Sequence, residues 1–188
     1  MDYVFTTVHI SSYVPVPILE IGSFLQDNDI DRVRKLFARE SKDFLQKYFK
    51  KELFFTDVEG KTKDEVLKNL CRKVEQEKGL PETFTASVLK REELTPTDYG
   101  NLVALPHPER AFQERAFVAV AVLKEPIFWF RQKVQVVFLT AIGREEDENL
   151  QQFYEATTDL ILRPADVQNL IRHPDYDRLI QLLRRAEE

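Results

Sequence analysis

The segment Pro106-His107-Pro108 contains the residue best suited to covalent chemistry with a partner. Histidine suits a nucleophilic role because its neutral form is abundant near neutral pH. Each flanking proline fixes its own φ and restricts the residue before it, so the local chain has little freedom left. Since the segment follows the apolar run 102–105, we expect the His107 imidazole at a strand end, facing solvent, where it can meet a partner's reactive atom.

A second candidate group is the pair Arg91-Glu92. The guanidinium has the permanent charge and fork geometry that hold phosphoryl oxygens, and the adjacent acid can pair with it or orient a histidine. The alternative is a solvated helix end, because the run 90–93 reads Lys-Arg-Glu-Glu. Spacing alone leaves both interpretations open, and it leaves a structural role open for His107 as well.

The other nucleophiles and potential ligands fit structural roles better. His9 closes a predicted strand and His173 precedes a proline at a helix junction, so both are expected to be structural or simply exposed. Cys71 falls in an apolar helical stripe, which indicates a small buried residue rather than a reactive thiol. The sequence has no His-x-His or Cys-x-x-Cys spacing, no glycine-rich phosphate loop and no nucleotide fingerprint. We therefore expect neither a metal nor a cofactor.

Composition narrows the class of protein. The 188 residues, 43% hydrophobic and 31% charged, suit one sizeable packed domain, or one domain plus a fragment. With 27 basic and 32 acidic residues the net charge is −5, so no strongly basic surface is available for a nucleic-acid backbone. A single cysteine excludes an intramolecular disulfide and indicates a reducing compartment. No apolar run approaches the ~18 residues that span a bilayer, so we expect a cytoplasmic protein without direct nucleic-acid or membrane contact.

The N-terminal part predicts a small β-β-α unit. Residues 3–8 and 16–21 are rich in β-branched and aromatic side chains and predict strands, and a helix with one apolar face follows from residue 29 to about residue 38. Two strands and one helix make a thin core, because small units bury too little surface to offset chain entropy. The charged segment 41–52 is interpreted as a linker into a larger unit.

The larger unit alternates strands with helices. Thr62 and Glu65 have capping-box spacing, and the helix that they begin should end at Gly79. The predicted elements are a strand at 53–55, helices at 62–79 and 82–93, a turn at 98–100, strands at 102–105, 117–123 and 134–142, and helices at 148–161, from 164 and around 176–183. This order predicts an α/β or α+β sandwich.

The run 89–108 is similar to the corresponding part of enzyme IIA domains of the fructose/mannitol type, from the sugar phosphotransferase system (PTS). That family has an Arg-Glu pair and a Thr-x-x-Gly turn before an Ala-Ile-Pro-His core. Here Arg91, Glu92 and Thr97 match, and a leucine replaces the isoleucine. The likeness covers about residues 53–186. It implies a sandwich in which helices flank a mixed β-sheet.

The resemblance also implies roles for individual residues. In the family, the histidine of the Pro-His motif, here His107, accepts a phosphoryl group from the phosphohistidine of the carrier protein HPr and passes it to a cysteine of a IIB domain. The family arginine, here Arg91, stabilises the phosphate, whereas Glu92 and Thr97 match the motif without an assigned role. Transport members of the mannitol branch carry a second histidine where this chain has Asn149. Asparagine cannot shuttle a proton, so we expect the transfer rate or partner preference to differ from that of a transport enzyme.

The two N-terminal strands are similar to the later strands of a IIB domain, whose phosphorylated cysteine would precede this chain. The order IIB-like, then IIA-like, resembles the C-terminal part of BglG-type transcriptional regulators, which also contain PTS regulation domains (PRDs). We therefore predict a IIB-like remnant at 1–40, a linker at 41–52 and a IIA-like phosphoacceptor domain at 53–188, all within a longer protein.

Three functions follow from the resemblance. The preferred one is a regulatory phosphoacceptor domain of a sugar-responsive regulator or antiterminator, phosphorylated on His107 by HPr. The alternative is a transport enzyme IIA that passes phosphate to a IIB component during fructose- or mannitol-type uptake; Asn149 and the IIB-like fragment favour the regulator. A pure interaction module is disfavoured by the intact Arg91 and His107. In the first two the chain is a phosphohistidine carrier, and its partners are HPr and a IIB domain or other domains of the parent protein. The sugar, the phosphorylated ring nitrogen and the oligomeric state are left open.

Overall fold

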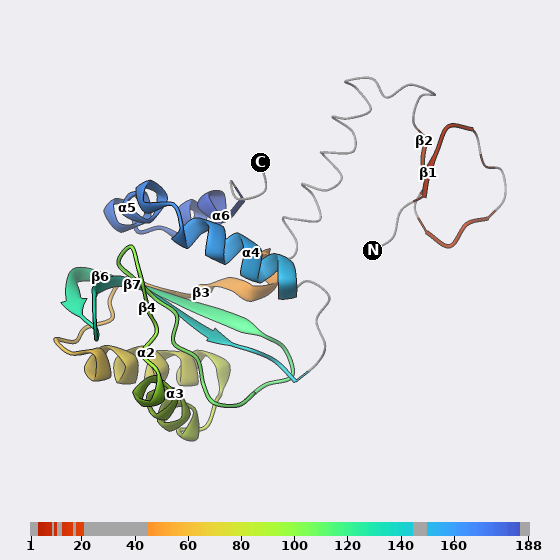
Figure 1. The fold of residues 1–188 in the computed structure, drawn as a ribbon. Coiled ribbons are helices and arrows are strands. Elements are labelled where there is room, and N and C mark those ends of the chain that lie inside the picture. The colour runs from red at the N-terminus through yellow and green to blue at the C-terminus, as the bar shows by residue number, and fades with distance from the viewer. Residues whose placement is uncertain are drawn as a thin grey trace. The chain divides into compact units, whose positions relative to one another are not determined.

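The computed structural model describes residues 4–8, 10, 13–16, 18–20, 45–144 and 150–184. The chain divides into two compact units, Met1–Lys42 and Asp43–Glu188 (Figure 1). In the first unit, β1 (Val4–Thr6) and β2 (Ile18–Glu20) pair in parallel. Both lie within predicted strands, and the helix predicted at 29–38 lies outside the described residues.

The second unit is built on a five-stranded sheet with the order β3-β6-β7-β5-β4. Its strands are β3 (Phe49–Phe55), β4 (Asp98–Gly100), β5 (Val103–Ala104), β6 (Phe117–Phe128) and β7 (Lys133–Ala141). β6 and β7 form an antiparallel hairpin, while β3 pairs in parallel with β6 and β5 in parallel with β7. β4 completes the other edge, antiparallel to β5. The predicted mixed sheet is confirmed.

Helices cover both faces of this sheet (Figure 1). α2 (Lys63–Lys78) and α3 (Thr83–Leu94) lie on one face. α4 (Leu150–Ile161), α5 (Pro164–Arg172) and α6 (Tyr176–Arg184) lie on the opposite face. In the described part of the chain, no helix combines the length and the apolar character needed to cross a membrane.

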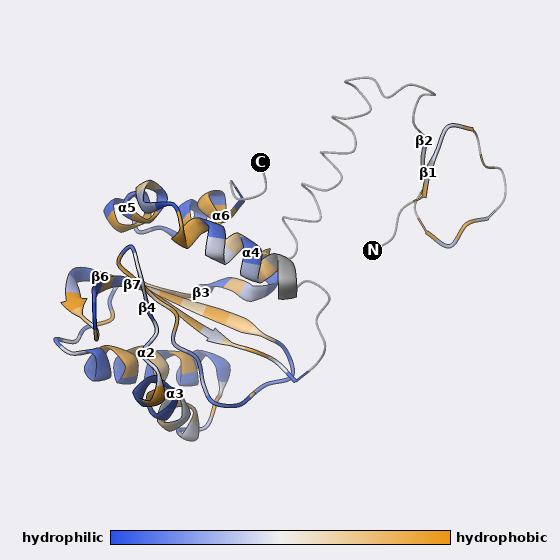
Figure 2. Ribbon diagram, viewed as in Figure 1, coloured by the Kyte–Doolittle hydropathy of each residue, from blue (hydrophilic) through white to orange (hydrophobic). Residues whose placement is uncertain are grey.

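Alternation along the central strands produces two separate cores. Successive side chains of a strand point to opposite faces, so Val118 and Val120 of β6 pack into the core beneath α4–α6. Ala119 and Ala121 pack into the core beneath α2 and α3. Figure 2 shows the hydrophobic colours along the central strands. Because both faces are covered, these strands read in sequence as continuous apolar runs.

The ends of α2 are set by local side-chain chemistry. Thr62 Oγ1 accepts the backbone N–H of Glu65 at 3.3 Å, and the Glu65 carboxylate accepts the N–H of Lys61 at 2.8 Å. Gly79 ends the helix in the left-handed conformation, with φ of 64°, which glycine adopts without steric cost. The predicted start and stop of this helix are confirmed.

The segment predicted as a linker differs in its second half. Leu45, Tyr48 and Phe49 are at most 1% exposed and belong to the core beneath α4–α6. β3 already begins at Phe49, so residues 45–52 are part of the larger unit. The charged residues that suggested a linker lie on the solvent side of an edge strand, where charge is common.

The turn predicted at 98–100 is also displaced. Residues 98–100 form β4, and the turn follows at Asn101 and Leu102, whose φ values are 49° and 65°. A two-residue hairpin turn of this hand needs positive φ at both central positions. Asparagine tolerates that conformation, but leucine rarely adopts it, so this hairpin could not be predicted from its turn residues.

Candidate functional site

His107 lies just beyond the C-terminal end of β5, and its side chain is half-buried. Its Nδ1 atom lies 3.3 Å from the carbonyl oxygen of Leu105. A carbonyl oxygen only accepts hydrogen bonds, so Nδ1 carries the proton in this contact and Nε2 keeps the lone pair of the neutral ring. This contact therefore makes Nε2 the ring atom that is free to react.

Backbone hydrogen bonds fix the chain around His107. The N–H of Leu105 donates to the carbonyl oxygen of Thr97 at 3.1 Å, which ties the segment to the connection that follows α3. The carbonyl oxygen of Pro106 accepts the N–H of Thr140, near the end of β7, at 3.0 Å. The two bonds come from opposite sides of the segment and agree with the stiffness expected from its prolines.

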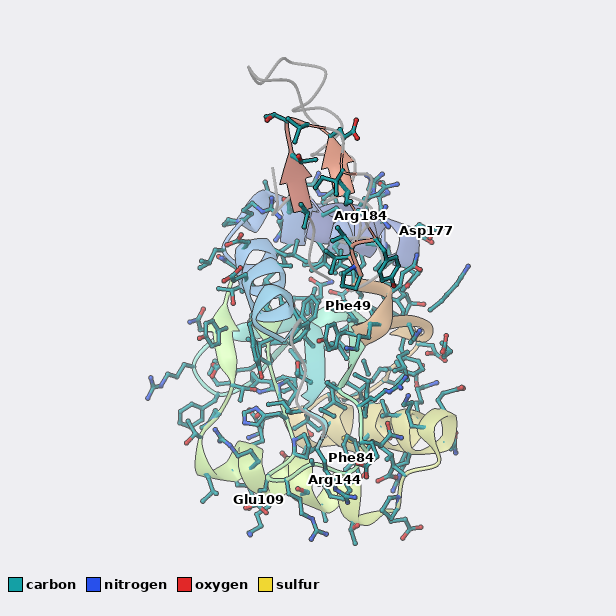
Figure 3. All side chains as sticks on the ribbon, turned by 90° about the vertical axis from the view of Figure 1, so that its right-hand side faces the viewer. Phe49, Phe84, Glu109, Arg144, Asp177 and Arg184 are labelled. Carbon is teal, nitrogen blue, oxygen red and sulfur yellow. The ribbon has the colours of Figure 1, made fainter. Side chains whose placement is uncertain are left out.

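The middle of α3 runs along the same segment. The Ser87 hydroxyl accepts the backbone N–H of Glu109 at 2.9 Å, and Lys90 forms an ion pair with the Glu109 carboxylate at 3.0 Å; Figure 3 shows Glu109 beside α3. Arg91 follows Ser87 by about one helical turn and so lies on the same side of α3. It is half-buried, and its guanidinium donates to the carbonyl oxygen of Thr95 at 3.3 Å. The predicted arginine and histidine thus come from two segments that pack together.

Glu92 is a buried acid at the end of α3, with only 1% of its surface exposed. Its carboxylate accepts three hydrogen bonds: from the Thr97 N–H at 2.8 Å, from the Thr97 hydroxyl at 2.8 Å and from the Trp129 indole N–H at 2.7 Å. The interpretation of 90–93 as a solvated helix end is therefore wrong for Glu92. The structure brings Glu92 and Thr97 into direct contact.

The remaining candidate residues lie away from His107 and Arg91 or are not among the residues that the structure describes. Asn149 and His9 are not among the described residues. His173 is exposed just after α5. Cys71 is fully buried, and burial, helped by the charge of Glu75, raises the pKa of its thiol to about 12, so it is not a nucleophile in the folded protein. Within residues 4–8, 10, 13–16, 18–20, 45–144 and 150–184, acidic, histidine and cysteine side chains form no group of three or more that could hold a metal ion.

Sequence reasoning missed three residues that shape the site. Ser87 and Glu109 carried no recognisable signal, because their contact joins a helix to a loop. Trp129 carried only a partial one. An indole N–H needs an acceptor wherever a tryptophan is buried. The run Phe128-Trp129-Phe130 does not show which ring is buried, and in the structure it is Trp129, between the exposed Phe128 and Phe130.

Comparison with known sequences identifies similar proteins. The family model described as "Phosphoenolpyruvate-dependent sugar phosphotransferase system, EIIA 2" matches residues 47–186. The probable licABCH operon regulator of Bacillus subtilis is 34% identical over 179 residues, which is 95% of this chain. The transcriptional regulator ManR of the same organism is 24% identical over 180 residues, or 92% of this chain. The aligned part makes up 28% of the length of each regulator.

Comparison with solved structures agrees on the fold. The crystal structure of IIA mannitol from Escherichia coli has a TM-score of 0.56 at 17% sequence identity. The match covers 70% of this chain and 96% of that one. At this level of identity the likeness concerns the arrangement of helices and strands.

Proposed function

Because the chain belongs to the EIIA 2 family of the phosphoenolpyruvate-dependent sugar phosphotransferase system, we propose that it is a phosphoacceptor domain and that His107 receives the phosphoryl group. One observation carries this proposal: the contact of Nδ1 with the Leu105 carbonyl leaves Nε2 with a lone pair on a ring held in place. A nucleophile that is already fixed loses little entropy when it meets its donor.

The donor is the phosphohistidine of an HPr-type protein. Nε2 of His107 attacks the phosphorus in line while the phosphorus–nitrogen bond of the donor breaks, and the donor imidazole leaves with that electron pair. The proton stays on Nδ1, hydrogen-bonded to the Leu105 carbonyl oxygen. Arg91 neutralises charge on the phosphoryl oxygens. Its single hydrogen bond, to the Thr95 carbonyl at 3.3 Å, is long and therefore weak, so a phosphate oxygen can replace that carbonyl as the acceptor.

We further propose that this domain works inside a cytoplasmic transcriptional regulator, where its phosphorylation reports sugar supply. Two regulators match more than nine-tenths of the chain, which supports this assignment. A phosphate adds about −1.5 to −2 charges. That charge would arise beside the Lys90–Glu109 ion pair and would change contacts with a neighbouring domain of the parent protein.

The domain organisation is part of the same proposal. Residues 1–40 are the tail of a IIB-like domain, and the phosphoacceptor domain follows in the Asp43–Glu188 unit. Asn149 stands where a transport enzyme would carry its second histidine, which also favours regulation over transport. DNA contacts would belong to other parts of the parent protein, since this chain has a net charge of −5.

A transport enzyme IIA, which hands its phosphate to a IIB component, is the second candidate. The shared fold with IIA mannitol supports it. Adding a sugar-specific IIB component and its membrane partner to the phosphorylated chain separates the two functions. A transport enzyme would support rapid sugar phosphorylation, whereas a sensor would support very little.

Phosphorylation itself is tested by incubating the chain with phosphoenolpyruvate, enzyme I and HPr and mapping the acid-labile adduct. We expect label on His107 and none on a His107→Ala variant. His173→Ala is the matched control, because His173 is an exposed histidine outside the site, and it should be labelled like the wild type. Label retained by His107→Ala would refute the assignment.

A further inference from the structure

The carboxylate of Glu92 joins three segments that are far apart in the sequence. It lies near the end of α3, and it accepts hydrogen bonds from the N–H and the hydroxyl of Thr97, in the connection to β4, and from the indole of Trp129, in the β6–β7 turn. The two N–H groups can only donate, so they need an acceptor at this place. With 1% of the residue exposed, it is the carboxylate and not bulk water that satisfies these donors in the folded protein.

A continuous chain of hydrogen bonds leads from Glu92 to His107. Glu92 holds the N–H and the hydroxyl of Thr97, and the Thr97 carbonyl accepts the N–H of Leu105 at 3.1 Å. The Leu105 carbonyl in turn lies 3.3 Å from Nδ1 of His107. Each link fixes the group that makes the next one. The orientation of the imidazole therefore depends on an acid that does not touch it.

We propose that Glu92 is a positioning residue that, through Thr97 and Leu105, sets the angle at which Nε2 of His107 meets the phosphoryl donor, and that it links this ring to Trp129. This inference rests on the proposed phosphorylation of His107. It assigns a role to an acid that would otherwise serve only to stabilise the end of α3.

Two expectations separate positioning from simple stabilisation. Loss of Glu92 should slow phosphoryl transfer at saturating HPr rather than weaken HPr binding, because a buried carboxylate cannot contact the donor protein. In addition, phosphorylation of His107 should be sensed at Trp129. The sequence contains one tryptophan, so its fluorescence and its indole N–H resonance report on this link without interference.

The variants are chosen to remove the carboxylate or to keep its geometry. Glu92→Ala removes all three hydrogen bonds. Glu92→Gln keeps an oxygen for the Thr97 N–H and the Trp129 indole, and its amide can donate to the Thr97 hydroxyl, so it should restore function. Glu93→Ala is the matched control, because Glu93 is the neighbouring acid and is exposed. Thr97→Val is a milder variant that deletes only the hydroxyl contact.

The experiment measures the rate of His107 phosphorylation over a range of HPr concentrations, with folding of each variant checked by circular dichroism. We expect the maximal rate of Glu92→Ala to fall about tenfold to a hundredfold, as for a reacting group displaced by about 1 Å, with little change in the half-saturating HPr concentration. Glu92→Gln and Glu93→Ala should stay within about threefold of the wild type. If Glu92→Ala does not fold, Thr97→Val must show a smaller decrease of the same kind.

The resonance of the Trp129 indole N–H is followed in the wild type before and after phosphorylation. We expect it to shift in the wild type and in Glu92→Gln, and to shift less in Thr97→Val, which keeps the backbone hydrogen bonds of the link. An unchanged wild-type resonance, or a wild-type maximal rate in folded Glu92→Ala, would overturn the positioning role while leaving the phosphoacceptor function intact. A wild-type chain that takes no label on His107 would overturn both.

Discussion

Truncation at residue 53 should unfold the larger unit, whereas truncation at residue 43 should not. The change compares two fragments, 53–188 and 43–188, with the full chain. Residue 53 is the start of the domain predicted from the sequence, directly after the predicted linker. The structure begins the core earlier, with Leu45, Tyr48 and Phe49, which are 0%, 0% and 1% exposed.

The magnitude follows from these three side chains. Full burial of a large apolar side chain contributes about 1.5–3 kcal/mol, so together they contribute about 5–9 kcal/mol. The whole stability of an ordinary domain is about 5–15 kcal/mol. The shorter fragment also loses the Phe49 carbonyl, to which the Tyr176 hydroxyl donates at 2.9 Å, and the ring contacts of Phe49 with Phe138 and Phe153.

Urea unfolding followed by circular dichroism measures the effect. We expect a cooperative transition for 43–188 and a strongly lowered or absent one for 53–188. In the full chain, Phe49→Ala should cost about 3–5 kcal/mol, while Lys50→Ala, which changes an exposed neighbour, should cost less than about 0.5 kcal/mol. Equal urea midpoints for the two fragments would show that residues 43–52 are a linker after all.

Three further results are expected. In the folded protein, Cys71 should react with a disulfide reagent at pH 8 at least about a thousandfold more slowly than in the unfolded chain, because its pKa rises from 9.0 to about 12 and the thiolate becomes correspondingly rare. A fast reaction of the folded protein would contradict the burial of Cys71. Gly143→Ala should destabilise the fold by about 2–3 kcal/mol, because a Cβ there would overlap the Glu114 carbonyl and neighbouring backbone atoms that cannot move away. Gly79→Ala, in open space at φ 64°, should cost only about 1 kcal/mol, and thermal unfolding of the two variants compares these costs. The hydrogen bond from Lys73 lowers the pKa of Asp57 in the folded state, so the pair stabilises the fold above the ordinary carboxyl pKa of 3.8 and loses this effect as the pH falls through the folded pKa. Asp57→Asn should lower the free energy of unfolding by only a few tenths of a kcal/mol at pH 7, because the pair is exposed. The difference in stability between this variant and the wild type should vanish in acid.

Most helices and central strands could be predicted because their signals are local. Thr62 and Gly79 mark the ends of α2 with side-chain and backbone chemistry that acts within a few residues. The boundary at 45–52 could not be predicted in this way. Phe49 is buried by Phe138 and Phe153, which lie far along the chain, while its neighbours on β3 are charged. Burial that depends on distant partners leaves no pattern in the local sequence.

Part of the candidate site could likewise be predicted from the local sequence, and part could not. The stiffness around His107 follows from its own prolines, so the residue could be singled out from sequence. The role of Glu92 could not, since an acid within a charged run usually faces water, and only the fold brings the Trp129 indole to it. The hydrogen bond between Nδ1 and the Leu105 carbonyl could not be predicted from the sequence either, because it depends on the rotamer of the His107 side chain.

The irregular pairing of β3 limits how two copies of this unit could associate. From Phe49 to Phe54 the strand advances five residues, while its partner β6 advances only two, from Val118 to Val120. The surplus forms a bulge, and Lys50, Lys51 and Glu52 stand exposed along it. An incoming strand needs an unbroken row of free N–H and C=O groups. The β3 border of the sheet is thus protected against fibril-like growth.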